Sequence, residues 1–184
     1  MLRGAGVAFD VIKPNVDEDA VKASLAAAGT NARDTADALA QLKALKVSAH
    51  EPAALVLGSD SVVELDDGRL LDKPDSVDQA AEHLRLLSGK RHRLRSAAVI
   101  AEGGRPVWRA VDTATLTVRP LSEAFIAQYL DAEWPAIAGC VGCYRIEGPG
   151  AQLFAQVEGS HFTILGLPLL PVLEYLRTRG VMTS

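Results

Sequence analysis

The sequence of 184 residues has only two cysteines, few aromatic residues and no long apolar stretch. No apolar run approaches the roughly 20 residues that a membrane-spanning helix needs, and the first residues lack the apolar region of a secretory signal. The net charge of −4 comes from interspersed acids and bases, which argues against a general attraction to nucleic acid or to an anionic membrane. We therefore expect a soluble, cytoplasmic protein with no nucleic-acid and no membrane partner.

Three common signatures of catalysis or nucleotide binding are also missing. The sequence contains no G-x-x-x-x-G-K-[ST] phosphate loop, no G-x-G-x-x-G dinucleotide fingerprint and no G-x-S-x-G nucleophile turn. Any site for a nucleotide must therefore be built from residues that are scattered along the chain.

The two cysteines are close together, as Cys140 and Cys143 in a C-x-x-C spacing. This spacing suits a dithiol redox site or half of a zinc site. A zinc site needs two further ligands, and His161 is the only histidine that follows. Free cysteines are more often small buried apolar side chains, so we favour packing beside Gly139 and Gly142 and keep a redox protein as an alternative.

The rest of the chain alternates between strand and helix patterns, and its length suits one well-filled core. Short apolar or alternating runs predict strands, and apolar residues at helical spacing after a capping residue predict helices. Expected strands cover about 7–12, 54–57, 62–65, 69–71, 91–101, 106–118 and 152–157. Expected helices cover about 15–28, 32–49, 76–87, 122–130 and 168–180. We expect a single domain, 1–184.

One stretch places an acid and a base at the two ends of a predicted strand pair. Ala54–Leu57 predicts a strand buried on both faces, and Gly58 breaks this run, so Asp60 should lie where the strand leaves the core. Asp67-Gly68 predicts a type I′ hairpin that returns the chain towards Lys73. If the hairpin is short, Asp60 and Lys73 face a common ligand.

Two helices and a glycine-rich segment add to this pair. Glu18 lies at the N3 place of a helix that Asn15 would cap, so it is a helix-start acid or a metal ligand, and the pattern favours neither. Lys43 lies near the rim of the next helix, where most lysines are solvated. The segment 138–150 holds four glycines, which let the backbone approach a ligand closely. Carboxylates, lysines and glycines together suit metal-assisted attack of water on a phosphoanhydride.

Six motifs, in order and over nearly the whole chain, carry a family resemblance: GSDSVV, DKP, LSGKRH, RPLS, AGCVGCYRIEGPGAQLF and FTILGLPL. In these motifs the sequence resembles the Maf family of nucleoside triphosphate pyrophosphatases. The resemblance implies an α/β fold with a mixed, twisted central sheet flanked by helices, similar to the inosine triphosphatase type. It also implies hydrolysis of a nucleoside triphosphate, common or modified, to a monophosphate and pyrophosphate, with Mg²⁺ or Mn²⁺ as cofactor, in the housekeeping of non-standard nucleotides.

The resemblance also assigns roles to four charged residues. Asp60 matches the acid that accepts the proton of the attacking water, and Glu18 matches an acid that joins Asp60 at the metal. Lys73 and Lys43 match lysines that face the phosphates of the substrate. The resemblance therefore predicts a catalytic acid, a metal pair and a phosphate-binding pair.

Two further positions match residues that help to select the base, and these are Ser61 and Glu147. In the thymidine and uridine triphosphate branch of the family the two positions are typically Thr and Gln. Glu147 is closer to the branch that cleaves 7-methyl-GTP, because a carboxylate can accept hydrogen bonds from a guanine edge, whereas Ser61 fits neither branch. The base preference stays open.

The chain also departs from the family pattern at three places. Family members begin with a strand, an S-x-S-P-R-R loop and a helix, whereas this sequence starts inside that helix; a family acid appears as Ser160, and a family glycine as Asp72. Loss of the loop arginines would weaken phosphate binding, since each charge-assisted contact is worth about 1.5 to 3 kcal/mol. The alternative function is therefore a catalytically impaired, nucleotide-binding or regulatory relative. Family members commonly form dimers, which implies a homodimer.

Overall fold

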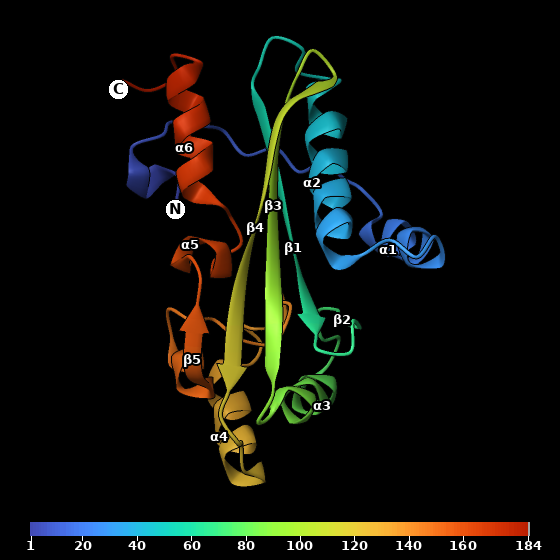
Figure 1. The fold of residues 1–184 in the computed structure, drawn as a ribbon, viewed down its shortest axis with the longest axis vertical. Helices are drawn as coiled ribbons and strands as arrows, with labels where there is room; N and C mark the ends of the chain where they lie inside the picture. Colours follow the sequence, from blue (N-terminus) through green and yellow to red (C-terminus); the bar gives the residue numbers. More distant parts are fainter. Residues whose placement is uncertain (184) are drawn as a thin grey trace. The chain divides into compact units, whose positions relative to one another are not determined.

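The structure is a computed structural model that describes residues 1–183. The described chain divides into two units. Unit 1 consists of Met1–Ser61, Ser96–Asp112 and the segment from Gly166 onwards, and unit 2 consists of Val62–Arg95 and Thr113–Leu165. The elements, labelled in Figure 1, are η1 (Arg3–Ala5), α1 (Glu18–Ala27), α2 (Ala32–Ser48), β1 (Val56–Leu65), β2 (Leu70–Leu71), α3 (Val77–Leu87), β3 (Arg91–Glu102), β4 (Arg105–Val118), α4 (Glu123–Glu133), η2 (Pro149–Leu153), β5 (Phe154–Glu158), α5 (His161–Ile164) and α6 (Leu169–Thr178).

The five strands form one sheet in the order β2-β1-β3-β4-β5. The pairs β1–β2 and β4–β5 are antiparallel, and a two-residue turn at Gly103-Gly104 joins β3 to β4. The ribbon in Figure 1 shows successive strands of the order running in opposite directions. The α/β class is thus confirmed, and the sheet is antiparallel where we expected a mixed sheet.

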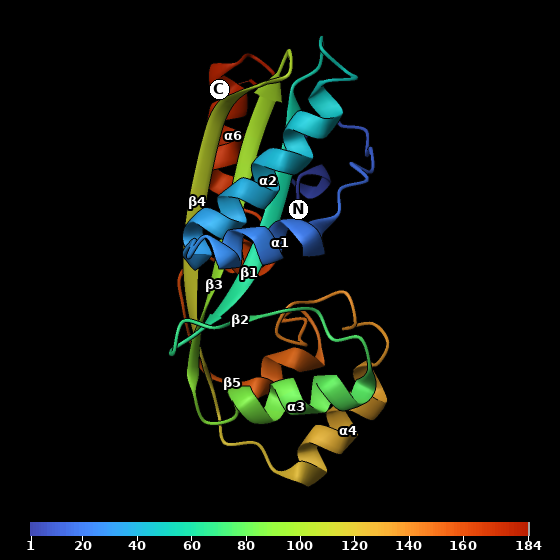
Figure 2. The same cartoon turned by 90° about the vertical axis from the view of Figure 1, so that its right-hand side faces the viewer.

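Unit 1 places one long helix on each face of its part of the sheet. Two neighbouring residues of β4 show this, because adjacent strand side chains point to opposite faces. Trp108 stacks on Tyr175 of α6, with ring centroids 5.2 Å apart, whereas Arg109 pairs with Asp37 of α2. Figures 1 and 2 show α2 and α6 on opposite sides of the strands. The apolar face predicted for α2 is confirmed at Ala36, Leu39, Ala40 and Ala44, which are buried.

Unit 2 has a core of its own, to which its strands, α3, α4 and the glycine-rich segment contribute. The helix α3 packs against α4, and both begin at a serine cap, as predicted. Ser76 accepts a hydrogen bond from the backbone of Gln79, and Ser122 accepts one from Phe125. The largest buried side chains of this core include Leu84, Leu87, Leu116, Ile137 and Leu153.

The segment before α1 is not the strand that its alternation predicted. Residues 7–17 have no regular structure, and Val11 and Ile12 are 74% and 51% exposed. The predicted cap of α1 is wrong as well: Asn15 has a positive φ of 49°, and Asp17 caps the helix by accepting from the backbone of Ala20. A strand pattern needs a neighbouring strand to be realised, and this segment is not among the five strands of the sheet.

The hairpin after β1 is present, but its geometry differs from the prediction. Of the turn residues, only Gly68 has a positive φ, whereas a type I′ turn needs two. The backbone N–H of Leu65 donates to the carbonyl of Arg69, and that of Gly68 donates to the carbonyl of Leu65. This is a three-residue loop with a left-handed glycine at its end. It sets the register of Val63 opposite Leu71.

The remaining predictions agree with the structure within a few residues at the element ends. The β3–β4 pair, β5 and α6 lie where the patterns predicted, and residues 138–148 form a loop. Among residues 1–183, no helix is both long and apolar enough to cross a bilayer.

Candidate active site

A glycine in the middle of β1 allows α2 to approach the strand very closely. We expected Gly58 to end a strand, but β1 runs on through it, and the glycine serves the close approach. A Cβ atom at this position would lie 2.6 Å from the backbone N of Ala44 and would also clash with the carbonyl oxygen of Ala40. Any other residue would therefore push the helix away. The contact brings the α2 side chain that lies next to Ala44 within reach of β1.

That side chain is Lys43, and it lies between two carboxylates. Its Nζ is 2.6 Å from Oδ1 of Asp60, on β1, and 2.9 Å from Oε1 of Glu18, at the start of α1. The side chains of Asp60, Lys43 and Glu18 are 9%, 17% and 28% exposed. Three of the six predicted site residues thus form one half-buried ion cluster, which we call the acid–lysine triad.

The surroundings of the triad change the proton affinities of two of its members. Burial raises the pKa of the Asp60 carboxyl above its ordinary value, and the Lys43 ammonium offsets this only in part. Burial lowers the pKa of Lys43, but the two carboxylates outweigh burial, so that its pKa is raised. For Asp60, burial and the negative charge of Glu18 together outweigh the positive charges of Lys43 and Lys22, whereas Lys43 faces two negative neighbours. The raised pKa makes Asp60 a better proton acceptor than an ordinary carboxylate.

Asp60 also has an oxygen that is available for a ligand. Its Oδ2 is buried and has no hydrogen-bond partner in the part of the chain that the structure describes. Buried carboxylate oxygens without a hydrogen-bond partner are rare in folded proteins, and a bound ion is one group that can satisfy such an oxygen. No group of three or more His, Cys, Asp or Glu side chains within residues 1–183 is arranged for a metal ion. Two converging carboxylates still fit Mg²⁺, which usually takes one or two carboxylates together with water and phosphate oxygens.

Ser61 follows Asp60 but points to the other face of β1. Its Oγ is 2.6 Å from the Oγ of Ser96 on β3, and the neighbour on the same face, Ser59, donates to the carbonyl of Gly166 at 2.8 Å. Side chains alternate between the faces of a strand, so Ser61 cannot share the surroundings of Asp60. The role of Ser61 in selecting the base stays a prediction.

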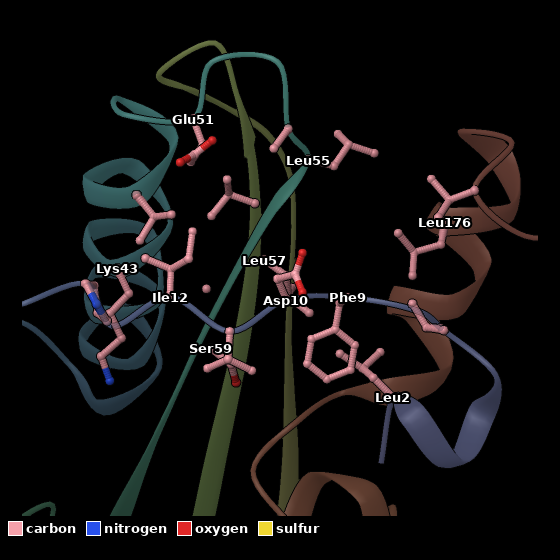
Figure 3. Close-up of a pocket in the computed structure, with 18 of the residues that line it drawn as sticks. Leu2, Phe9, Asp10, Ile12, Lys43, Glu51, Leu55, Leu57, Ser59 and Leu176 are labelled. Atoms are coloured by element: carbon pink, nitrogen blue, oxygen red, sulfur yellow. The ribbon is translucent and has the colours of Figure 1, made fainter.

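A cavity of about 520 Å³ lies beside the triad in unit 1. Its wall is mostly apolar and includes Phe9 and Ile12 from the segment before α1, with Leu57 from β1 (Figure 3). Lys43 lines this cavity, whereas Asp60 does not. The cavity is therefore an apolar neighbour of the triad and does not itself contain the predicted chemistry.

The two other predicted site residues, Lys73 and Glu147, belong to unit 2, and both are exposed. Both residues affect the pKa of the Cys140 thiol. Burial raises this pKa, the negative charge of Glu147 raises it further, and the positive charge of Lys73 lowers it. Unit 2 thus gathers the predicted phosphate-binding lysine and the predicted base-selecting acid near Cys140. The prediction that Lys73 faces a common ligand with Asp60 stays untested.

The thiols themselves are poorly suited to redox chemistry. Both are free, and Cys143 is fully buried, which raises its pKa to about 12. The reactive form of a cysteine is the thiolate, so raised pKa values make Cys140 and Cys143 inert. The predicted packing role is favoured over the redox alternative.

Sequence reasoning overlooked three charged residues that contribute to these surroundings. The positive charge of Lys22 lowers the pKa of Asp60. Lys22 lies one helical turn after Glu18, and this spacing could have indicated that it lies near the triad. Arg145, in the same motif as Glu147, pairs with the buried Glu133 of α4 at 2.9 Å. Arg145 lies in a loop and Glu133 at the end of a helix, and no local sequence pattern connects the two residues.

Comparison with known proteins agrees with this geometry. The sequence model of the Maf family, described as Maf-like protein, matches residues 1–179. The chain is 52% identical over 181 residues to a protein of Sphingopyxis alaskensis named nucleoside triphosphate pyrophosphatase. The aligned residues cover 98% of this chain and 91% of that protein. Proteins of the same name from Caulobacter vibrioides and Ruegeria pomeroyi are 49% and 47% identical, over 100% of this chain and 91% and 92% of their own lengths. A family match over nearly the whole chain, with relatives at this level of identity, means that the chain belongs to the Maf family.

Proposed function

We propose that this protein is a nucleoside triphosphate pyrophosphatase, a hydrolase that acts on a phosphoanhydride bond. The observation that carries the proposal is the acid–lysine triad, in which a buried carboxylate of raised pKa lies 2.6 Å from a lysine ammonium. The names of the relatives support the same reaction class.

Asp60 acts as the proton acceptor. Water adds to the α-phosphorus, the bond from this phosphorus to the α–β bridging oxygen breaks, and pyrophosphate leaves while Asp60 takes the proton of the water. A positioned general base contributes about 10²- to 10⁴-fold to a rate, and it works best when its pKa is closer to the working pH than that of a free carboxylate. Burial raises the pKa of Asp60 in this direction.

The lysines supply positive charge to the phosphates. Lys43 is held on a helix by two carboxylates, so its ammonium needs little reorganisation when a polyanion arrives. Lys73 lies on an exposed loop of unit 2, and its assignment to the phosphates rests on the family resemblance of the motif DKP.

A divalent cation, Mg²⁺ or Mn²⁺, is a further part of the proposal, held by Glu18 and Asp60. When bound, such an ion neutralises phosphate charge and polarises the bond that breaks. The buried, unpaired Oδ2 of Asp60 supports this assignment. Lys43 contacts Oδ1 of Asp60, so Oδ2 is the oxygen of Asp60 that remains for an ion.

Base recognition is assigned to unit 2, where Glu147 is exposed. An ionised carboxylate only accepts hydrogen bonds, so it favours a base edge with N–H donors, as guanine has. We therefore propose a guanine-containing triphosphate, common or modified, as the preferred substrate.

The alternative of a nucleotide-binding relative without turnover is not favoured. Glu18, Lys43 and Asp60 are assembled in ion-pair contact, and a protein that only binds a nucleotide has no need of a buried base. A cytoplasmic location and a homodimer complete the proposal.

Pyrophosphate release from a panel of triphosphates tests this function. The panel contains GTP, 7-methyl-GTP, UTP, dTTP, CTP and ATP, each with and without Mg²⁺ or Mn²⁺, with both products identified by chromatography. We expect equal amounts of monophosphate and pyrophosphate, fastest from a guanine substrate. Release of single phosphate in place of pyrophosphate, or no hydrolysis of any member, would contradict the proposal.

A further inference from the structure

The loop that carries Glu147 has one built conformation, although it has no regular secondary structure. Gly142 has a φ of 81°, and a Cβ there would lie 2.6 Å from Cε1 of Tyr144. A Cβ at Gly150 would lie 2.5 Å from the carbonyl oxygen of Arg145. Larger residues at these glycines would displace the chain on both sides of Glu147, so the loop path is fixed by its packing.

Two buried tyrosine hydroxyls hold the loop from behind. Tyr129, on α4, donates from its hydroxyl to the carbonyl oxygen of Cys143 at 3.0 Å. The hydroxyl of Tyr144, in the loop, hydrogen-bonds to Nε2 of His92 on β3 at 2.9 Å, and its ring packs edge-on against Phe154. Consecutive loop residues are thus tied to a helix and to a strand of unit 2.

An ion pair holds the next residue of the loop. Arg145 donates from Nε and Nη2 to one carboxylate oxygen of Glu133, at 3.1 and 2.9 Å. The Glu133 side chain is only 5% exposed, so the pair is formed at the edge of the core. Residues 143, 144 and 145 are therefore each held, and Glu147 follows two residues later on the surface.

We propose that the hydroxyls of Tyr129 and Tyr144 are positioning groups that hold Glu147 in place for base recognition. The inference rests on the proposed role of Glu147. A carboxylate that must be ordered during binding loses affinity for its ligand, whereas one on a loop that is already held does not. Small displacements of such a group weaken recognition, because hydrogen bonds to a base depend steeply on distance and angle.

The chain offers a matched test, because it has three tyrosines and two of them hold this loop. Tyr129→Phe and Tyr144→Phe each remove one hydroxyl and keep the ring, and Tyr175→Phe in unit 1 is the control, since Tyr175 stacks on Trp108. KM and kcat are measured for GTP and for UTP with the Mg²⁺-supplemented enzyme. We expect Tyr129→Phe and Tyr144→Phe to raise the KM for GTP about two- to tenfold and to lower the GTP-to-UTP ratio of kcat/KM, with little change in kcat for GTP. We expect Tyr175→Phe to change neither the KM for GTP nor this ratio.

Glu147→Gln separates the failure of this inference from the failure of the proposed function. The positioning role is wrong, and the proposed function stands, if Glu147→Gln changes the GTP-to-UTP ratio of kcat/KM but the two tyrosine variants leave this ratio unchanged. The same conclusion follows if Tyr175→Phe lowers the ratio as much as the other two tyrosine variants do. If Glu147→Gln also leaves the ratio unchanged, both the positioning role and the base contact are wrong. Should circular dichroism show that a tyrosine variant does not fold, Arg145→Lys replaces it, because a lysine keeps the charge but loses the two-point contact with Glu133.

Discussion

The two units hold their predicted site residues in opposite ways. In unit 1, Glu18 and Asp60, on a helix and a strand, both contact Lys43 on a second helix directly. In unit 2, Lys73 and Glu147 are exposed on loops, and the buried hydrogen bonds hold residues 143 and 144 of the loop that carries Glu147. Proton transfer needs fixed distances and a changed pKa, which regular elements and burial provide, whereas recognition of a base needs a surface that a ligand can enter.

The buried polar groups of the two units also differ in their roles. The buried member of the triad, Asp60, is an acid that must be ionised to accept a proton. In unit 2, His92 and Tyr144 are buried and neutral: burial lowers the pKa of His92 to about 4, and it raises the pKa of Tyr144 well above its ordinary value. Unit 1 thus buries a charge that the reaction uses, whereas unit 2 holds its loop with neutral hydrogen bonds and with the ion pair between Arg145 and Glu133.

Asp60→Asn should have the largest effect, and only on turnover. Removal of the base is expected to lower kcat about 10²- to 10⁴-fold in a pyrophosphate-release assay. The folded state of the unchanged protein holds the proton of Asp60 more tightly than the unfolded state does, so ionised Asp60 opposes folding once the pH is above its raised pKa. Asp60→Asn should therefore be no less stable to urea at pH 7. Glu102→Gln, which breaks an ion pair with Arg179 elsewhere in unit 1, is the control for turnover.

Acid should destabilise the protein through His92. Its pKa is about 4 in the folded state and about 6.5 in the unfolded state, so the unfolded state binds more protons between these values. The free energy of unfolding should therefore fall as the pH is lowered through this window, by about 2 kcal/mol between pH 7 and pH 5 from this group alone. Urea unfolding at the two pH values measures it. His92→Gln should reduce this dependence, and His50→Gln, on the surface, should not; equal pH dependence in all three proteins would argue against a neutral buried His92.

Lys43→Met should affect both activity and stability, which distinguishes it from Asp60→Asn. Without the ammonium, two nearby carboxylates lose their common partner, at a cost of about 1.5 to 3 kcal/mol. Loss of a phosphate contact of the same size would lower kcat/KM about 10- to 100-fold. Lys46→Met, one turn along the same helix and exposed, is the matched comparison, and similar losses in both variants would show that the triad has no special role.

Replacement of both cysteines should have the smallest effect. Cys140→Ser combined with Cys143→Ala is expected to leave turnover within about twofold and stability within about 1 kcal/mol, because the thiols act as packing groups. Assays with and without a reducing agent should agree for the unchanged protein. A large loss of turnover in the double variant would revive the redox interpretation.

The sequence predicted features that depend on local signals and missed those that depend on a distant partner. The serine caps at Ser76 and Ser122 and the turn between β3 and β4 depend on neighbouring residues, and all three are present. The sequence pattern predicts that Gly58 ends a strand, whereas its actual role, the close approach of α2, depends on residues of the helix. The strand predicted at 7–12 failed for the related reason that a strand pattern does not specify its partner.

The candidate site followed the same division. The family resemblance supplied Glu18, Lys43 and Asp60 as separate positions, and only the structure joined them into one ion cluster. Period-two alternation along β1 could have placed Ser61 on the face opposite Asp60. The pair of Arg145 with Glu133 could not have been predicted, since neither residue has a local signal for it.

The central claim is that Asp60 is the base of the hydrolysis and does not itself select the nucleobase, and nucleotide binding by the Asp60→Asn variant tests it most directly. Calorimetric titration with the triphosphate panel, in the presence of Mg²⁺, gives the order of affinities. The claim predicts that the variant binds guanine triphosphates best, in the same order as the kcat/KM values of the unchanged enzyme, and releases pyrophosphate at least about 100-fold more slowly than that enzyme. Pyrophosphate release at the rate of the unchanged enzyme, or a base preference that disappears in the variant, would contradict it.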